Sequence, residues 1–160
     1  MAAKIYDAVE GGVTDVHSSQ KNQIGRIVKG EDSSGGFAEY IYMQGVASNA
    51  VGTWVSYDES YVPTRTVADA QGRVAVAMAA IDATTEFGWY QITGKVSALC
   101  LASFADNGKV YLTSTAGSVD DADVAGDFVV GAIGRSARDT TTGLATFELN
   151  RPVVQDTAFD

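Results

Sequence analysis

The stretch Glu86–Ser118 (EFGWYQITGKVSALCLASFADNGKVYLTSTAGS) constrains the fold of this chain more than any other part of it. β-Branched and aromatic residues fill its apolar runs, and Asp106-Asn107-Gly108 interrupts them. Asn-Gly between alternating apolar runs is a strong hairpin signal, because both residues tolerate positive φ angles. The stretch therefore predicts β-structure, with a central strand at Phe87–Thr93 and a hairpin at Asn107-Gly108.

Length and composition indicate a single globular domain. The chain has 160 residues, of which 46% are hydrophobic and 19% charged, so it is long enough to bury a core. It contains 2 Pro and 17 Gly, so its turns come from glycine and from Asn or Asp.

Other short strands are predicted from aromatic, β-branched or alternating residues. They are Gln23–Lys29, Phe37–Val46, Gly52–Asp58, Thr64–Val67, Gly72–Ala80, Val96–Leu101 (alternatively a helical turn around Ser97–Phe104), Lys109–Thr115, Asp127–Gly134 and Leu144–Arg151. No long amphipathic helix separates them. The predicted fold class is therefore all-β, a small antiparallel β-barrel or β-sandwich.

Alternation within these strands predicts which residues share a face. In Phe37–Val46, Tyr40 and Tyr42 face away from Ile41 and Met43. Three further pairs of faces are expected: Val74, Val76 and Met78 against Ala75, Ala77 and Ala79; Phe128 and Val130 against Val129 and Ile133; and Ala145, Phe147 and Leu149 inward against Thr146, Glu148 and Asn150 outward. The small alanine face in Gly72–Ala80 favours a strand packed closely against a neighbour.

The two ends of the chain are less regular than its middle. Residues 1–36 are polar and punctuated by glycine, and they predict an extended N-terminal arm. This arm is either a poorly ordered terminus or a segment that becomes ordered against a partner. Residues 37–152 form the single β-domain, and residues 153–160 form a C-terminal tail.

Charge and cysteine content exclude several classes of protein. The formal net charge of −9 argues against nucleic acid as a partner and disfavours anionic membranes. Cys100 is the only cysteine, so an intramolecular disulfide is impossible, and its apolar neighbours predict a buried side chain. No apolar run approaches the roughly 18 residues of a membrane span, and the N-terminus lacks a hydrophobic signal region.

Three patterns resemble catalytic or metal-binding motifs, and each fails on its spacing or its partners. Gly88–Lys95 has five residues between its glycines, where a phosphate-binding loop needs four, and Val96 follows the lysine. The acidic loop at Ser118–Gly126 lacks the last ligand of an EF-hand, because Ala132 occupies that position. His17 is the only histidine and lies in the predicted arm. The chain is therefore predicted not to be an enzyme, and no catalytic, cofactor-binding or metal-binding residue is assigned.

Six aromatic residues have two interpretations. They could line a sugar-stacking face, but they more often form the core of a sheet and its cross-strand pairs. The six are Tyr40, Tyr42, Trp54, Tyr57, Trp89 and Tyr90. If they stack on sugars, Trp54→Ala or Trp89→Ala should abolish glycan binding without unfolding the protein.

Most of the chain resembles the small capsid decoration, or cement, proteins of tailed bacteriophages. The stretches that carry the resemblance are Gln23–Ser48, Trp54–Glu59, Gly72–Ile81, Glu86–Val96 and Phe104–Pro152. The resemblance lies in the order of these stretches along the chain and in their general residue pattern, and it includes no short diagnostic motif. It implies a β-rich protein on the outer surface of an icosahedral head, made in the bacterial host cytoplasm and often trimeric, which clamps neighbouring major capsid subunits.

The expected function is therefore that of a structural virion protein that stabilises a phage capsid by bridging major capsid subunits. The acidic surface, the missing disulfides and an arm that orders on binding agree with this role. The alternative function is a carbohydrate-binding accessory module on a virion or cell surface. The expected partners are the major capsid protein and further copies of the chain, as a trimer, without nucleic acid or membrane.

Overall fold

The computed structural model describes residues 2–7 and 9–154, and the fold is all-β as predicted. Eleven strands form one antiparallel sheet that does not close on itself, so the fold is sandwich-like and not a closed barrel. Within these residues there is no helix long and apolar enough to cross a membrane. The strands are β1 (Lys4–Ile5), β2 (Ile27–Glu31), β3 (Phe37–Gln44), β4 (Trp54–Tyr57), β5 (Pro63–Arg65), β6 (Gly72–Ala77), β7 (Phe87–Leu99), β8 (Lys109–Leu112), β9 (Val119–Asp120), β10 (Phe128–Gly134) and β11 (Leu144–Val154).

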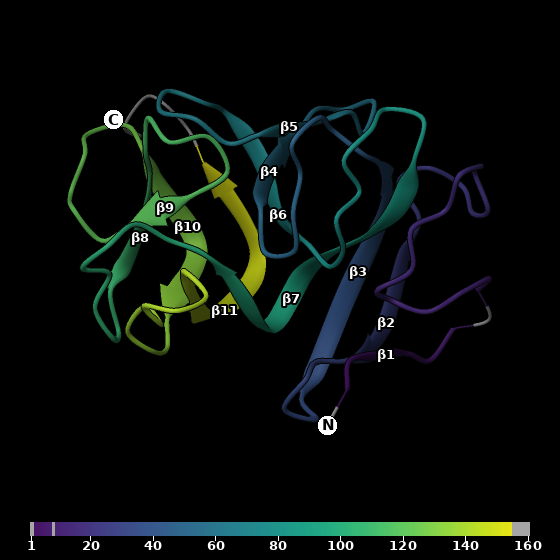
Figure 1. Cartoon of the computed structure of the whole chain (residues 1–160), viewed down its shortest axis with the longest axis horizontal. Coiled ribbons are helices and arrows are strands. Elements are labelled where there is room, and N and C mark those ends of the chain that lie inside the picture. Colours follow the sequence, from purple (N-terminus) through teal and green to yellow (C-terminus); the bar gives the residue numbers. More distant parts are fainter. Residues whose placement is uncertain (1, 8, 155–160) are drawn as a thin grey trace.

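The long strand β7 joins the two halves of the sheet. The strand order is β1-β2-β3-β7-β6-β11-β10-β8-β9, and β4 pairs with β5 and β6. The first part of β7, through Thr93, pairs with β3, and the part from Thr93 to Leu99 pairs with β11. In Figure 1, β7 accordingly runs from β3 on the right to the group of β8, β10 and β11 on the left.

β7 bends near its middle, as Figure 1 shows, and a glycine lies there, where β3 ends on one edge of the strand and β11 begins on the other. Gly94 has a φ angle of +98°, and a Cβ atom placed on it would lie 2.6 Å from the carbonyl oxygen of Phe37. Only glycine fits this conformation and this close approach without strain. The register between β3 and β7 shifts nearby, between Glu39 and Tyr40, as it does at a β-bulge.

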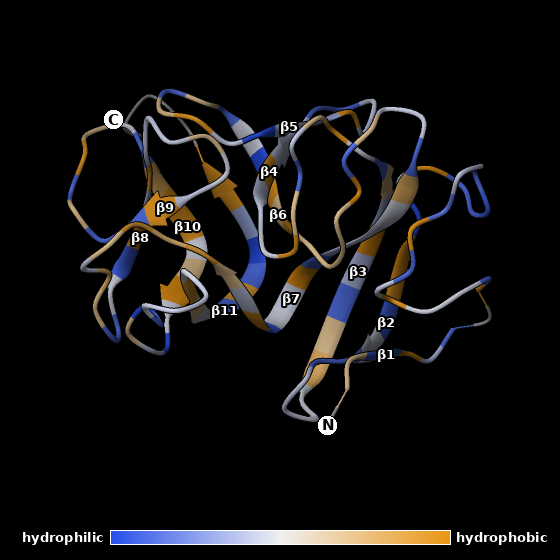
Figure 2. Ribbon diagram, viewed as in Figure 1, coloured by the Kyte–Doolittle hydropathy of each residue, from blue (hydrophilic) through white to orange (hydrophobic). Residues whose placement is uncertain are grey.

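The predicted alternation in β3 is confirmed, although both of its faces are buried. Tyr40 and Tyr42 pack with Trp89 in one core cluster, and Ile41 and Met43 belong to a second cluster. A third core lies between β6, β7, β10 and β11 and contains Phe147. The hydrophobic colours of Figure 2 follow these strands through both halves of the molecule.

The predicted strand at Gly72–Ala80 is present as β6, with its two faces in different cores. Val74 and Val76 join the core that contains Phe147, whereas Ala75 and Ala77 face the cluster that contains Ile41. The prediction for the last strand is also confirmed, because its inward side chains are all buried in the first of these cores. They are Ala145, Phe147 and Leu149.

The predicted hairpin at Asn107-Gly108 is wrong, although the turn itself exists. Asn107 has a φ angle of +59°, and the Gly108 N–H donates to the Ala105 carbonyl at 3.2 Å. The strand after the turn, β8, nevertheless pairs with β9 and β10 and not with β7. The end of β7 already bonds to β11, and the Leu99 N–H donates to the Gly52 carbonyl at 2.9 Å on its other edge. β7 therefore has no free edge there for β8.

The sheet begins before residue 37 and extends past residue 152. Within the segment predicted as an arm, β1 pairs with β2, and β2 pairs with β3 along its whole length. Val13 and Val28, both nearly fully buried, cover Tyr40, Tyr42 and Trp89. At the other end, β11 continues to Val154, and the rest of the predicted tail, residues 155–160, lies outside the described residues.

Candidate interaction surface

A buried carboxylate holds the loop between β2 and β3 against the bend in β7. Asp32 is 2% exposed, and its Oδ2 accepts a hydrogen bond from the Lys95 N–H at 2.8 Å. Its Oδ1 accepts from the Ser34 N–H and hydroxyl and from the Gly36 N–H, at 2.7–3.0 Å. Burial raises the pKa of Asp32, but these hydrogen bonds together outweigh it and hold the pKa below its ordinary value.

An ion pair joins β3 to β11 beside this bend. Arg151 donates to both carboxylate oxygens of Glu39, at 3.1 and 2.7 Å, and the Thr93 hydroxyl donates to the same group at 2.8 Å. The bond from Arg151 is the largest cause that lowers the pKa of Glu39, against burial, which raises it. Together with Asp32, these residues fix the relative position of the two halves of the sheet.

The two stretches that resemble phosphate-binding and calcium-binding motifs belong to a strand and to a hydrogen-bonded loop of the fold. Gly88–Lys95 lies inside β7, where an extended backbone cannot surround a phosphate. Asp121 in the acidic loop accepts from the Ala105 N–H at 2.9 Å, and Asp127, directly after this loop, is buried and accepts from the Asp69 N–H at 2.7 Å. In the part of the chain that the structure describes, no three His, Cys, Asp or Glu residues are grouped to hold a metal ion.

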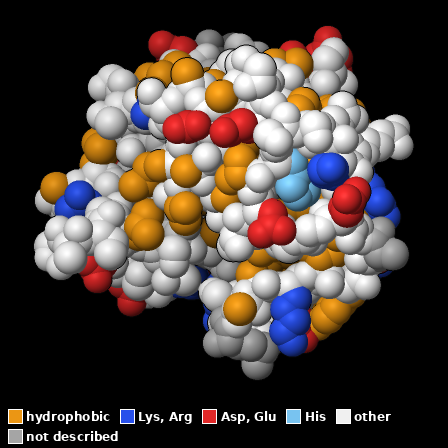
Figure 3. Space-filling view, turned by 45° about the vertical axis from the view of Figure 1, so that its right-hand side comes forward, with side chains coloured by type: hydrophobic (Ala, Val, Ile, Leu, Met, Phe, Trp, Pro, Cys, Tyr) orange, Lys and Arg blue, Asp and Glu red, His pale blue; other side chains and the backbone are white. Residues whose placement is uncertain are grey.

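The single cysteine and the single histidine of the sequence both make contacts within the fold. Cys100 is buried as predicted, and burial raises the pKa of its thiol to about 11. His17 forms a backbone bridge with Phe87, and its Nδ1 lies 2.8 Å from the Tyr42 hydroxyl. It reaches the molecular surface near acidic side chains, as Figure 3 shows. His17 thus joins the N-terminal segment to β3 and β7.

The core interpretation of the six aromatic residues is confirmed. Trp54 and Trp89 have no exposed surface, and the largest exposed fraction among the six is 6%, at Tyr57. The Trp54 Nε1–H donates to the Leu99 carbonyl at 3.0 Å, and its ring packs edge-on against Phe147. These rings present no face to a sugar, so they do not support the carbohydrate-binding alternative.

Apolar side chains lie exposed on the outer face of β10. Phe128 and Val130 are 42% and 55% exposed, and Val130 lies directly opposite Val153 of β11. Residues two apart on a strand, and residues opposite each other in an antiparallel pair, share a face. Phe128, Val130 and Val153 therefore form one continuous surface, which we call the apolar strip. The Phe128 ring also contacts Tyr111 of β8.

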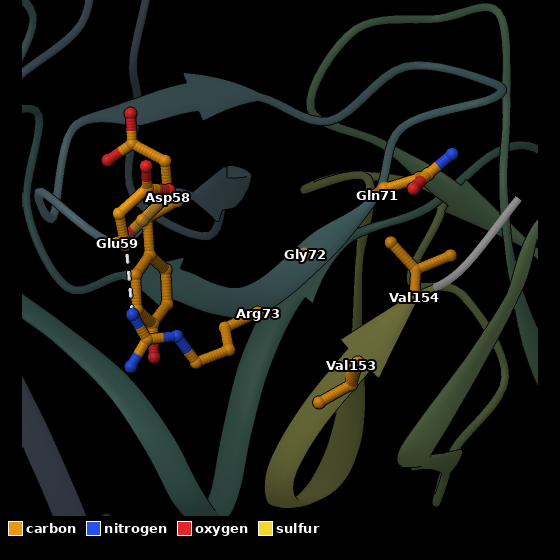
Figure 4. A pocket seen from close by; sticks show the side chains of 8 residues that line it. Asp58, Glu59, Gln71, Gly72, Arg73, Val153 and Val154 are labelled. Carbon is orange, nitrogen blue, oxygen red and sulfur yellow. Dashed lines mark hydrogen bonds between the residues drawn. The ribbon is translucent and has the colours of Figure 1, made fainter.

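The apolar strip continues into a hollow lined by charged residues. Val153 lies opposite Arg73 of β6, which lies opposite Tyr57 of β4. The Arg73 guanidinium sits 4.8 Å from the centre of the Tyr57 ring and donates to the Asp58 carbonyl at 3.2 Å. Figure 4 shows Arg73 reaching toward Asp58 and Glu59, with Val153 and Val154 across the hollow. The hollow encloses about 440 Å³, and its carboxylates are exposed.

A second apolar surface lies on the other half of the sheet. Phe37 is 56% exposed and lies opposite Glu31 of β2, and the Tyr6 hydroxyl donates to Glu31. Tyr6 is itself 61% exposed. We call Tyr6 and Phe37 the distal patch, because β7, β6 and β11 separate β3 from β10 in the sheet order. In Figure 1, β1, β2 and β3 lie on the right of the molecule and β10 on the left.

The sequence pattern does not identify the apolar strip. Phe128 and Val130 alternate with Val129 and Ile133, so both faces of this strand are apolar and either could be the buried one. The structure buries Val129 completely and leaves Phe128 and Val130 exposed. The signal that the sequence carries is that both faces of this strand are apolar, although one strand buries only one of them here.

Comparison of the chain with models of known protein families, with curated proteins and with solved structures gave no match.

Proposed function

We propose that this chain is a structural virion protein that binds the outer surface of a tailed-phage capsid and bridges neighbouring major capsid subunits. The observation that carries the proposal is the presence of two exposed apolar surfaces, the apolar strip and the distal patch, on opposite halves of one sheet. Exposed clusters of large apolar side chains mark protein contact sites. A bridging protein needs two such contacts.

A bridge also transmits force only if its two contact surfaces cannot move independently. β7 runs through both halves of the sheet, and Asp32 and the pair Glu39–Arg151 tie its bend to β3 and β11. Many copies, each with modest contacts, would then resist internal pressure through multivalency. The formal charge of −9 suits the outside of a shell that is packed with DNA. The resemblance also implies a trimer.

Reconstitution on particles tests this proposal. Particles that lack the protein are heated with and without added protein, and DNA release is followed with a fluorescent dye. We expect the added protein to raise the temperature of release. Equal release temperatures would contradict a stabilising role. Sedimentation equilibrium of the free protein tests the trimer.

A variant of the distal patch tests bridging. Phe37→Asp should weaken particle binding and lower the release temperature, because it places a charge in one of the two apolar contacts. Val51→Asp is the matched control, since Val51 is 53% exposed and lies in neither surface. If both variants protect particles as well as the wild-type protein does, the distal patch takes no part in the bridge.

A further inference from the structure

Exposed carboxylates lie near the apolar strip and the adjoining hollow. At one end, Asp58 and Glu59 line the hollow, and both are exposed. At the other end, the chain enters β10 from the acidic loop, in which Asp123 and Val124 are exposed. Exposed carboxylates therefore lie in the hollow and in the loop that leads into the strip.

Two arginines in this region, Arg73 and Arg151, are already engaged, and Arg151 is paired with Glu39. The Arg73 guanidinium lies over the rings of Tyr57 and Tyr61, at 4.8 and 5.2 Å from their centres, and donates to the Asp58 carbonyl. The Asp58 Oδ1 accepts from the Ser60 and Val62 N–H groups. The hydrogen bond from Arg73 goes to the backbone carbonyl of Asp58 and not to its carboxylate. The hollow thus presents negative charge to an incoming group.

This charge distribution selects between two kinds of occupant. A second copy of the chain, docked strip to strip, would bring like-charged carboxylates together, and both copies carry a net charge of −9. A partner with basic side chains beside an apolar surface would complement both the strip and its flanks. Complementary charge also accelerates association and makes binding sensitive to salt.

We propose that the apolar strip and the hollow are the docking site for a basic protein surface. Apolar side chains of the partner cover Phe128, Val130 and Val153, and a Lys or Arg side chain of the partner enters the hollow beside Asp58 and Glu59. The inference rests on the proposed function for the identity of the partner, a major capsid subunit. The chemistry of the partner follows from the residues of this face.

A peptide probe tests the docking chemistry without particles. The probe is the synthetic peptide acetyl-Leu-Lys-Val-Lys-Leu-amide, titrated into the full-length protein labelled with ¹⁵N and followed by NMR. We expect shifts confined to the amides of the apolar strip and the hollow, and smaller shifts as salt is raised. A probe in which glutamate replaces lysine should cause none. Shifts located elsewhere, or no shifts at millimolar peptide, would overturn the inference.

Matched variants test the same site on particles. Glu59→Lys should weaken binding about fivefold and Val130→Asp at least tenfold, whereas Glu10→Lys and Val51→Asp should stay within twofold of wild type. Glu10 is exposed, as Glu59 is, and Val51 is 53% exposed against 55% for Val130. If wild-type protein binds particles and both site variants bind equally well, the docking site is wrong and the proposed function stands.

Two further outcomes separate the remaining possibilities. If wild-type protein does not bind particles while the lysine peptide shifts the strip, the proposed function fails and the docking chemistry is retained. If the chain self-associates and Val130→Asp abolishes this, the occupant is a second copy and the inference is overturned.

Discussion

At the scale of single residues, the most consequential side chain is Asp32. Four donors converge on its carboxylate, and they come from its own loop and from Lys95 of β7, 63 positions away. A buried charge is tolerated only when hydrogen bonds replace its lost hydration. Asp32 satisfies this condition, so its ionised carboxylate stabilises the bend in β7.

Asp32→Asn should reduce the free energy of unfolding by about 2 kcal/mol at neutral pH, because the new amide group opposes the Lys95 N–H. The folded-state pKa of Asp32 is depressed, so its contribution is complete above the unfolded pKa and disappears as pH falls through the folded pKa. The difference between the variant and wild type should therefore shrink below about pH 4. Urea unfolding at pH 7 and at pH 3 measures both effects.

Asp123→Asn is the control for this experiment, since Asp123 is exposed in the acidic loop. It should change stability by less than about 0.5 kcal/mol. A difference between Asp32→Asn and wild type that is equally large at pH 3 and pH 7 would show that the carboxylate charge is not what stabilises the bend.

At the scale of elements, the bend in β7 decides the architecture. β3 lines one edge of β7 up to Thr93, and β11 lines the opposite edge from Thr93 to Leu99, so the bend lies where one neighbour ends and the other begins. The bend allows the face of β6 that carries Ala75 and Ala77 to pack against the face of β3 and β7 that carries Ile41.

Gly94→Ala should lower the free energy of unfolding by about 3 kcal/mol, because alanine at a φ angle of +98° is strained and its Cβ would meet the Phe37 carbonyl oxygen. Gly12→Ala is the matched control: its Cβ would have no neighbour closer than 3.8 Å. Chemical denaturation of both variants compares them. Equal stability of Gly94→Ala and wild type would show that the strand accommodates the bend without glycine.

At the scale of the whole molecule, the N-terminal segment is part of the folded domain. Residues from this segment bury one side of β3 and β7, including Tyr40, Tyr42 and Trp89, which otherwise would face water. Each large apolar side chain that is buried stabilises the fold by about 1.5–3 kcal/mol. A test of function that simply deletes residues 1–36 would therefore also damage the fold.

Deletion of residues 1–36 should yield a protein that binds a hydrophobic dye and unfolds at much lower urea concentration than wild type. Deletion of residues 1–5 is the graded control, because it removes β1, which contributes only two residues to the sheet. We expect this shorter deletion to lower the urea midpoint of unfolding much less than the longer one. An unaltered urea midpoint for the longer deletion would show that the segment is dispensable for folding and acts only as an arm.

The sequence by itself determined the local properties of this protein. Alternation with a period of two identified the all-β class, the opposite faces of β3 and β6, and the inward face of β11, because which way a side chain points depends only on its own strand. Residue type also predicted that Trp54, Trp89 and Cys100 would be buried. The spacing of the glycines in Gly88–Lys95 excluded a phosphate loop.

Only the tertiary structure decided which strands pair and which apolar face remains exposed. The Asn107-Gly108 turn forms, yet β7 pairs with β11, because strands compete for edges and a long ladder outweighs a local hairpin. The roles of Asp32 and Gly94 arise from contacts across the fold, with Lys95 and with Phe37. The exposure of Phe128 and Val130 likewise depends on what packs against Val129, a property that no single strand encodes.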